Sequence, residues 1–252
     1  MNRCAIAIPA RMASTRFPGK MLADLCGKPV IQHVIERMKR VRYCKDVYVA
    51  TDSEEILALA KALSVEALLT SPQCCSGSER IASVVSRIRG DWIFNVQGDE
   101  PFVDPVLVEN LLDQTNRIEA SILTPIFRIQ SQEDLFNPNV VKVVLDNKKN
   151  ALYFSRNPIP FVRGYAASDW LNKCVFWGHI GIYGYRRDLL SHYAQIESSE
   201  LEIAESLEQL RFLSSQYRIA TYETNYRPVA IDTKEDLVFA RTLIQSGHIN
   251  AC

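Results

Sequence analysis

The sequence predicts an α/β fold of three layers, in which helices cover both faces of a largely parallel sheet. In the N-terminal half, short apolar segments alternate with segments whose apolar residues recur every three or four positions. Strands that return through helices pair in parallel with right-handed crossovers. Polar side chains directly follow several of the strands, and ligands of such sheets gather at those carboxyl ends. A chain of 252 residues is long enough to bury the core of such a domain.

The N-terminal half supplies the parallel strands and their crossover helices. Pro29 suits a first helical turn, and Thr51-Asp52-Ser53 can cap the helix that follows. We expect strands at Cys4–Ile8, Asp46–Ala50, Val65–Leu69, Trp92–Val96 and Ala120–Phe127. We expect helices after Pro29, over Glu54–Leu63, around Ile81–Ile88 and after Pro105.

The second half has a different pattern. Two strands, Val140–Leu145 and Ala151–Ser155, are joined around Asn147–Asn150 as in a hairpin. Arg163–Asn172 is predicted to be a mobile loop. Further elements are expected at Gly178–Tyr185 (extended), Leu201–Leu213 (helix), Tyr217–Tyr222 (strand) and Thr233–Ser246 (helix). Without a linker or repeat, we predict one domain over residues 1–252 with an inserted lobe at approximately 136–215.

Composition argues against several classes of protein. The 29 basic and 29 acidic residues cancel, so no overall field favours nucleic acid or an anionic membrane. The seven cysteines have no zinc-site spacing, and we interpret them as small buried hydrophobes or inert thiols. With no signal peptide and no apolar run of membrane-spanning length, they indicate a reducing cytoplasm.

The first strand leads into a loop that carries Arg11, Arg16 and Lys20 among small residues. Fixed cations and free backbone N–H groups together suit a polyphosphate. The loop lacks the two glycines and the Lys-Ser/Thr of a Walker A motif. The alternative is a surface loop that is merely basic.

Two carboxylates follow apolar strands. Asp99 comes after Trp92–Val96 beside a glycine, and its place at the same edge as Arg11, Arg16 and Lys20 suits a magnesium ligand. Asp232 has the same layout, although Asp-Thr before a helix is also an ordinary N-cap.

Two further candidates remain ambiguous from the residues alone. Ser76-Gly77-Ser78-Glu79-Arg80 opens a helix whose free N–H groups can meet a base or a phosphate, or simply begin the helix. His179 is isolated in an extended run, where a structural role is the commoner one. Hydrolase, zincin and dinucleotide-binding motifs are absent from the sequence.

With these residues in view, the chain resembles the 3-deoxy-manno-octulosonate (Kdo) cytidylyltransferase family nearly end to end. The first loop and Gln97-Gly98-Asp99-Glu100-Pro101 mark the wider nucleotidyltransferase class. The Kdo-specific stretches are 136–156, 179–186 and 207–211, and further matches lie at 49–52, 76–80 and 231–237. Two departures are Ser78, where the family usually has Thr, and Ala230, where Gly often precedes Val/Ile-Asp.

The resemblance implies a nucleotide-diphospho-sugar transferase-like, Rossmann-like αβα fold with a mixed sheet, and a homodimer. The implied reaction transfers CMP from CTP to the anomeric hydroxyl of Kdo, with magnesium, for lipopolysaccharide biosynthesis. The implied nucleotide-binding residues are Arg11, Ser14, Arg16, Lys20, Ser76, Gly77, Ser78 and Arg80. The implied magnesium ligands are Asp99 and Asp232. The implied Kdo-binding residues are Gln97, Arg156, His179, Tyr183, Glu208 and Gln209.

Positioning and charge neutralisation dominate nucleotidyl transfer, so we assign Lys20 and Arg11, with Asp99 and Asp232, to catalysis. Arg156 is our candidate for the carboxylate of Kdo, because a guanidinium grips carboxylate at two points. Alternatives are a cytidylyltransferase for another carboxylated sugar, of the amino-Kdo or neuraminic acid type, and a catalytically silent nucleotide-binding module. A glycosyltransferase would need an Asp-x-Asp motif, of which only half is present.

Overall fold

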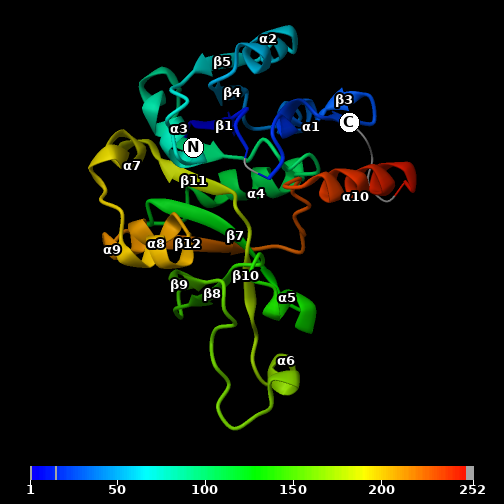
Figure 1. The fold of residues 1–252 in the computed structure, drawn as a ribbon. Coiled ribbons are helices and arrows are strands. Elements are labelled where there is room, and N and C mark those ends of the chain that lie inside the picture. The colour runs from blue at the N-terminus through cyan, green and yellow to red at the C-terminus, as the bar shows by residue number, and fades with distance from the viewer. Residues whose placement is uncertain (1, 15, 248–252) are drawn as a thin grey trace. The chain divides into compact units, whose positions relative to one another are not determined.

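A computed structural model describes residues 2–14 and 16–247 (Figure 1). The chain forms two compact units. The first comprises Met1–Asn116, Gly184–Tyr193 and Pro228–Cys252, and the second comprises Arg117–Tyr183 and Ala194–Arg227. The predicted assignment of one domain with a lobe at 136–215 remains a prediction.

The strands of the first unit lie in the order β5 (Glu66–Leu69), β4 (Asp46–Thr51), β1 (Cys4–Ala10), β6 (Trp92–Asn95) and β11 (Tyr183–Arg186). β1 pairs in parallel with both β4 and β6, and β4 pairs in parallel with β5. The predicted parallel sheet is therefore confirmed. β1 extends two residues beyond the predicted Ile8, which carries the strand to the loop that contains Arg11.

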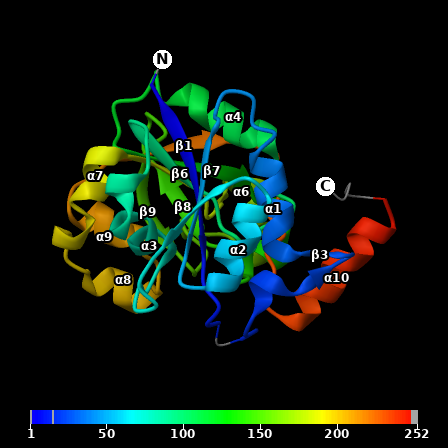
Figure 2. The ribbon, with the colours of Figure 1, turned by 90° about the horizontal axis from the view of Figure 1, so that it is seen from above.

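Helices lie on both sides of β1. α1 (Val30–Met38) and α3 (Gly77–Ser83) flank it on opposite sides, and α2 (Glu54–Ala62) lies on the side of α1 (Figure 2). The Ser53 hydroxyl caps α2 by accepting from the Ile56 amide, as the sequence predicts. The other helices of this unit are α4 (Pro105–Gln114), α7 (Arg187–Ser191) and α10 (Lys234–Gln245), with 3₁₀ turns at Lys20–Leu22, Val85–Arg87 and Tyr193–Gln195. A short hairpin, β2 (Asp24–Leu25) and β3 (Lys28–Pro29), precedes α1.

The second unit has a mixed sheet. β7 (Ile122–Arg128) pairs in parallel with β12 (Ile219–Glu223) and antiparallel with β10 (Trp177–His179). β10 also pairs with β8 (Lys142–Leu145), and β8 with β9 (Ala151–Ser155), both antiparallel. The helices are α5 (Gln132–Phe136), α6 (Trp170–Lys173), α8 (Glu200–Glu205) and α9 (Gln209–Ser214). The α/β class with a mixed sheet is thus confirmed.

Three predictions about this half are wrong in detail. The predicted extended run Gly178–Tyr185 is interrupted, because β10 ends at His179 and β11 begins at Tyr183. The predicted helix Leu201–Leu213 is two helices, because Ser206 adopts a left-handed conformation with φ 51° and ends α8.

The predicted loop at 163–172 contains helical turns, at Ala167–Asp169 and in α6. Figure 1 shows this segment extending away from the strands of its unit. Trp170 anchors it, since its ring is buried and lies 5.2 Å from that of Phe161 and 6.1 Å from that of Phe136. Trp170 thus gives a segment with loop character a buried aromatic contact with the rest of its unit.

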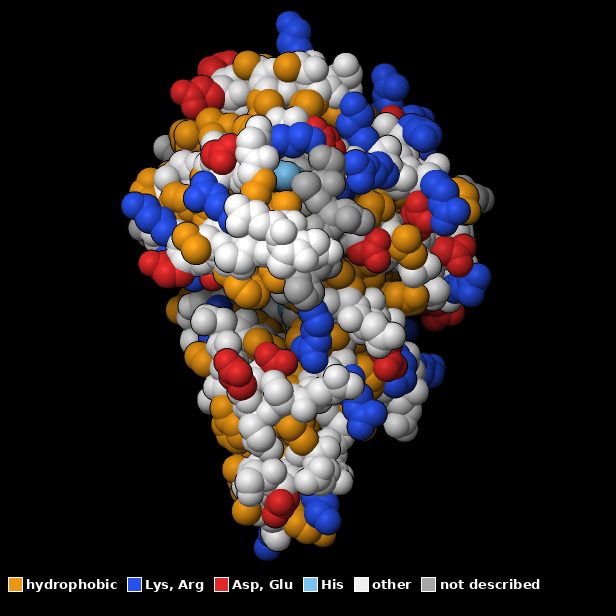
Figure 3. Space-filling view, turned by 90° about the vertical axis from the view of Figure 1, so that its right-hand side faces the viewer, with side chains coloured by type: hydrophobic (Ala, Val, Ile, Leu, Met, Phe, Trp, Pro, Cys, Tyr) orange, Lys and Arg blue, Asp and Glu red, His pale blue; other side chains and the backbone are white. Residues whose placement is uncertain are grey.

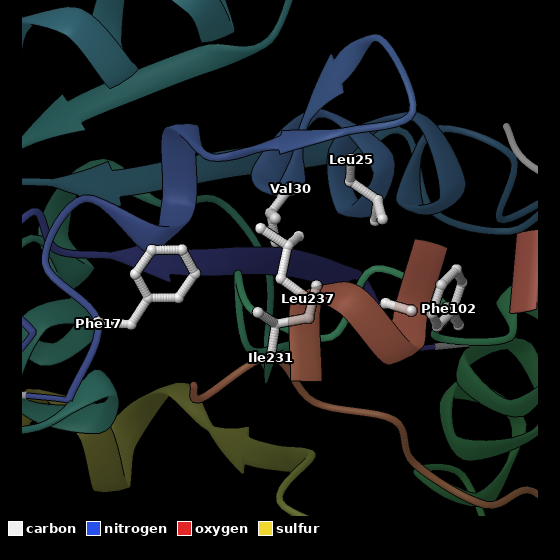
Figure 4. Close-up of a cluster of buried hydrophobic side chains, with 7 residues drawn as sticks. Phe17, Leu25, Val30, Phe102, Ile231 and Leu237 are labelled. Carbon is white, nitrogen blue, oxygen red and sulfur yellow. The ribbon is translucent and has the colours of Figure 1, made fainter. Parts of the chain in front are cut away.

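One cluster of buried side chains fixes the C-terminal segment of the first unit (Figure 4). Ile231 and Leu237 pack with Phe17, Val30 and Phe102, and Leu25 and Ala240 complete the cluster. Ile231 is fully buried, and each such side chain contributes about 1.5–3 kcal/mol of apolar burial. The cluster therefore holds the residue before Asp232 against the first loop and α1.

The surface and the cysteines bear on two further expectations. Basic and acidic side chains are interspersed on the face drawn in Figure 3, in keeping with the balanced charge of the sequence. The six cysteines in the described part of the chain are free; Cys44 and Cys74 are buried, as expected of small hydrophobes, whereas Cys26 and Cys75 are exposed thiols. Cys252 lies outside the described residues. Within residues 2–14 and 16–247, no helix has the length and apolar character needed to cross a membrane.

Candidate active site

Three sequence motifs meet at the carboxyl end of β1. A Cβ atom on Gly98 would lie 3.0 Å from the Pro9 carbonyl oxygen, and one on Gly77 would lie 3.0 Å from Pro9 Cγ. Both distances are tighter than most Cβ contacts, so the two glycines permit a close approach to Pro9. The start of α3 and the segment after β6 are thereby brought to the first loop. The resulting pocket is lined by Pro9, Ala10, Arg11, Lys20, Met21, Cys75, Ser76, Gly77, Arg80, Gln97, Asp99 and Asp232.

Two carboxylates from distant parts of the chain converge on one ammonium group in this pocket. Lys20 Nζ donates to Asp99 Oδ2 at 2.5 Å and to Asp232 Oδ1 at 2.9 Å. The Ile231 amide donates to the Asp99 carbonyl at 2.9 Å, which places Asp232 beside Asp99. The interpretation of Asp232 as the N-cap is wrong, because the Thr233 hydroxyl caps α10, and the apolar segment before Asp232 does not form the predicted strand.

The pairing shifts the pKa values of Lys20 and Asp232 toward their charged forms. Burial lowers the pKa of Lys20, but the carboxylates of Asp99 and Asp232 outweigh burial and leave that pKa above its ordinary value. Burial raises the pKa of Asp232, but Lys20 and Arg16 outweigh it, so the net pKa is lowered. Lys20 is therefore a cation at neutral pH and is unsuited to act as a general base.

Glu100 is a polar group that the sequence analysis did not single out. Its side chain is buried and its Oε2 has no hydrogen-bond partner among the described residues. Burial, together with the charges of Asp99 and Asp232, raises its pKa to about 8. Glu100 is therefore neutral at pH 7 and adds no third negative charge beside the two aspartates.

The predicted phosphate-binding cations differ in their surroundings. Arg16 is exposed and pairs with Asp232 at 3.1 Å, while Arg11 lines the pocket and makes no ion pair with any described residue. Ser14 does not line the pocket, and its hydroxyl accepts from the Phe17 amide at 3.4 Å. Arg11 is thus the pocket cation whose guanidinium is available to an incoming anion.

The predicted cytidine-binding stretch is only partly in the pocket. Ser76 and Gly77 line it, and the Ser76 hydroxyl caps α3 by accepting from the Glu79 amide. Ser78 is fully buried, outside the lining, with its hydroxyl 2.9 Å from that of Tyr185. The burial of Ser78 argues against a direct contact between its side chain and a nucleotide. The predicted nucleotide-binding role of Ser78 remains a prediction.

Arg80 lines the pocket, but its side chain is only 2% exposed. Its guanidinium is held by other residues of the protein. It donates to Thr70 Oγ1 at 2.5 Å and to Asp52 Oδ2 at 3.2 Å. Asp52 Oδ1 in turn accepts from the Met12 amide in the first loop at 3.3 Å. Asp52, which follows β4, thus connects Arg80 to the first loop. No role at the site was predicted for Asp52 from the sequence, although its position directly after a strand could have indicated one.

The candidate sugar-binding residues are divided between the units. Gln97 lines the pocket of the first unit, and the other five belong to the second. Arg156 donates to three backbone carbonyls, those of Glu205 at 2.7 Å, Pro138 at 3.0 Å and Ser206 at 3.2 Å. These bonds use three of its five N–H donors, so two remain for a substrate carboxylate.

His179 and Tyr183 lie together, with ring centroids 5.3 Å apart. His179 Nε2 lies 2.9 Å from Thr124 Oγ1, and burial lowers its pKa to about 3. Burial, with the charge of Glu208, raises the pKa of Tyr183 well above its usual value. Both rings are therefore neutral at pH 7. Glu208 is the residue before α9, and Gln209, its first residue, is buried.

The residues present fit magnesium on the chemistry of the donors. In residues 2–14 and 16–247, no group of three or more His, Cys, Asp or Glu side chains is placed to hold a metal. Magnesium needs fewer protein ligands where substrate phosphates supply oxygens, and one or two carboxylates are then sufficient. Asp99 and Asp232 already direct oxygens at one cation, the Lys20 ammonium.

Comparison with known proteins gives consistent results. A family model described as cytidylyltransferase matches residues 5–219. The 3-deoxy-manno-octulosonate cytidylyltransferase of Geotalea uraniireducens is 42% identical over 243 residues, covering 91% of this chain and 94% of the relative. The enzyme of the same name from Francisella philomiragia is 43% identical, covering 94% and 97%.

A solved structure of CMP:2-keto-3-deoxy-manno-octonic acid synthetase, complexed with CTP, is similar over nearly the whole chain. Its TM-score is 0.90 at 38% sequence identity, and the match covers 97% of this chain and 99% of that one. The likeness thus extends through both units of the chain.

Proposed function

This chain belongs to the cytidylyltransferase family, and from that premise we propose that it transfers CMP from CTP to Kdo and releases pyrophosphate. It is a nucleotidyltransferase. The observation that carries the proposal is the convergence of Lys20, Asp99 and Asp232 beside Arg11 in one pocket. In such a set the two cations can hold a triphosphate, and the two carboxylates would hold the magnesium that balances its charge during transfer.

In the reaction, the anomeric hydroxyl of the sugar attacks the α-phosphorus of CTP. A new P–O bond forms, the bond to the β-phosphate oxygen breaks, and the hydroxyl proton is lost. Arg11 and Lys20 stabilise the charge that develops on the α-phosphate and the leaving pyrophosphate, and Arg16 lies nearby for the outer phosphates. Since Lys20 remains protonated, it contributes charge and not basicity.

Asp99 and Asp232 would hold magnesium. Bound there, magnesium would neutralise phosphate charge and lower the proton affinity of the sugar hydroxyl. We also propose a homodimer, which rests on family membership, and a cytoplasmic location, which rests on the cysteine pattern as well. For the sugar carboxylate, the remaining N–H donors of Arg156 are our candidate.

The direct test is pyrophosphate release from CTP, measured with and without Kdo and with and without magnesium. We expect release that requires both. A parallel panel of carboxylated sugars, including amino-Kdo and neuraminic acid, measures preference among acceptors. CTP binding without release for any sugar would contradict the proposal and indicate a silent nucleotide-binding module.

A further inference from the structure

A buried chain of polar side chains runs from β11 to the pocket. The Tyr185 hydroxyl lies 2.9 Å from Ser78 Oγ at the start of α3. Asn95 Nδ2, at the end of β6, donates to Ser78 Oγ at 3.3 Å. Gln97 Nε2 donates to Asn95 Oδ1 at 2.9 Å, and Gln97 lines the pocket. Three of the four residues thus do not line the pocket but are linked to it.

Burying these polar groups costs desolvation free energy, and a role in packing alone would not require polar side chains. Tyr185 and Asn95 are 1% exposed and Ser78 is fully buried. A buried polar group destabilises the protein unless it is hydrogen-bonded, and apolar side chains of similar size would avoid that cost. A fully connected network instead specifies one arrangement of its members. The group that the network orients is therefore expected at its half-buried end, which is Gln97 in the pocket.

The network sets the direction of the Gln97 amide. Asn95 donates to Ser78 with its NH₂ group, so its carbonyl oxygen faces Gln97. A flipped Gln97 amide would oppose two carbonyl oxygens and lose the bond. No described residue donates to Gln97 Oε1. Gly77 leaves room for this amide, since a Cβ there would lie 3.3 Å from both Gln97 Oε1 and Nε2.

We propose that Tyr185, Ser78 and Asn95 are positioning residues that hold Gln97 with its carbonyl oxygen as an acceptor for a donor group of the bound substrate. The inference deepens the proposed function and rests on it. Two substrate groups have the required chemistry, a hydroxyl of the acceptor sugar and the exocyclic amino group of cytosine. The first would appear in the KM for the sugar and the second in the KM for CTP.

The test is a double-mutant cycle of Tyr185→Phe and Gln97→Ala. Tyr185→Phe removes one hydroxyl that does not line the pocket, and we expect one of the two KM values to rise by about 3- to 10-fold, with kcat within about twofold. In the Gln97→Ala background the same change should have no further effect on that KM, because the residues act through one group. Unchanged KM values, or equal effects in both backgrounds, would overturn the inference.

A second pair of variants guards against a global defect. Ser78→Ala should reproduce the KM effect of Tyr185→Phe, while Ser78→Thr, which retains a hydroxyl, should restore most of the wild-type value. Unfolding temperatures within about 4 °C of wild type would show that stability does not explain the change. If Ser78→Thr is as impaired as Ser78→Ala, the hydroxyl is not the operative group and the inference fails.

Failure of the proposed function is seen separately. A wild-type protein that binds CTP but transfers to no sugar contradicts the proposed function alone. The same cycle, measured on the dissociation constant for CTP, then decides the inference: coupling between Tyr185 and Gln97 supports it, and additivity overturns it.

Discussion

In the pocket of the first unit, charged groups neutralise one another, whereas the candidate sugar residues of the second unit are mostly neutral or held by backbone. Lys20 pairs with Asp99 and Asp232, and the pairing raises the pKa of Lys20 and lowers that of Asp232. His179 and Tyr183 are uncharged at pH 7 because burial shifts the pKa of each away from neutrality. The difference matches the substrates, since a triphosphate demands charge and a sugar demands shape and hydrogen bonds.

The largest expected effect is in the charged pocket of the first unit. We expect Asp99→Asn to reduce kcat by at least about a hundredfold, because it removes a charge from the pair that holds Lys20 and the proposed magnesium site. Asp104→Asn is the matched control: Asp104 only caps α4, by accepting from the Val106 amide. Near-normal turnover of folded Asp99→Asn at saturating magnesium would refute the assignment.

An intermediate effect is expected at Arg156, the charged member of the second unit's set. Arg156→Ala should raise the KM for Kdo about tenfold and, by loss of three bonds to carbonyls, lower the free energy of unfolding by about 2 kcal/mol. Steady-state kinetics and urea denaturation measure the two changes. A raised KM for CTP with an unchanged KM for Kdo would show that Arg156 serves the nucleotide instead.

The smallest effect tests whether the second unit's ring pair is neutral. The folded-state pKa of His179 is about 3, below its unfolded value of about 6.5, so the unfolded chain binds a proton first as the pH falls. The contribution of neutral His179 to stability is therefore fully present above pH 6.5 and is lost as the pH falls toward 3, by about 2 kcal/mol between pH 7 and pH 5. Urea midpoints at pH 7 and pH 5 measure this loss, which His179→Gln should reduce. An identical loss in the variant would show that folding does not lower the pKa of His179.

The sequence predicted the parallel strands and the place of Lys20 and Asp99 at one edge of the sheet. Asp232 directly follows no strand in the structure, and its position beside Asp99 depends on the bond from the Ile231 amide to the Asp99 carbonyl. Residues that directly follow buried parallel strands must emerge at one edge, so position along the chain predicts proximity. The roles of these residues, and of the sugar-binding set, remain predictions.

Other features depend on tertiary contacts that no local pattern encodes. The left-handed Ser206 ends α8 although the apolar spacing continues, so periodicity predicted a single helix. Ser78 looked like a nucleotide contact because it begins a helix, but its hydroxyl points to Tyr185, more than a hundred residues later. The aromatic contacts of Trp170 likewise order a segment with loop composition.

The pairing of Lys20 with two carboxylates has a consequence for the kinetics of nucleotide capture. Together with Arg16, these four groups sum to zero charge, so the field that reaches solvent from them is weak. Arg11, exposed and without an ion pair among the described residues, is then the group that first attracts an anion. Capture is expected to proceed in two stages, an encounter at Arg11 whose rate depends on ionic strength, followed by an exchange in which phosphate replaces carboxylate at Lys20.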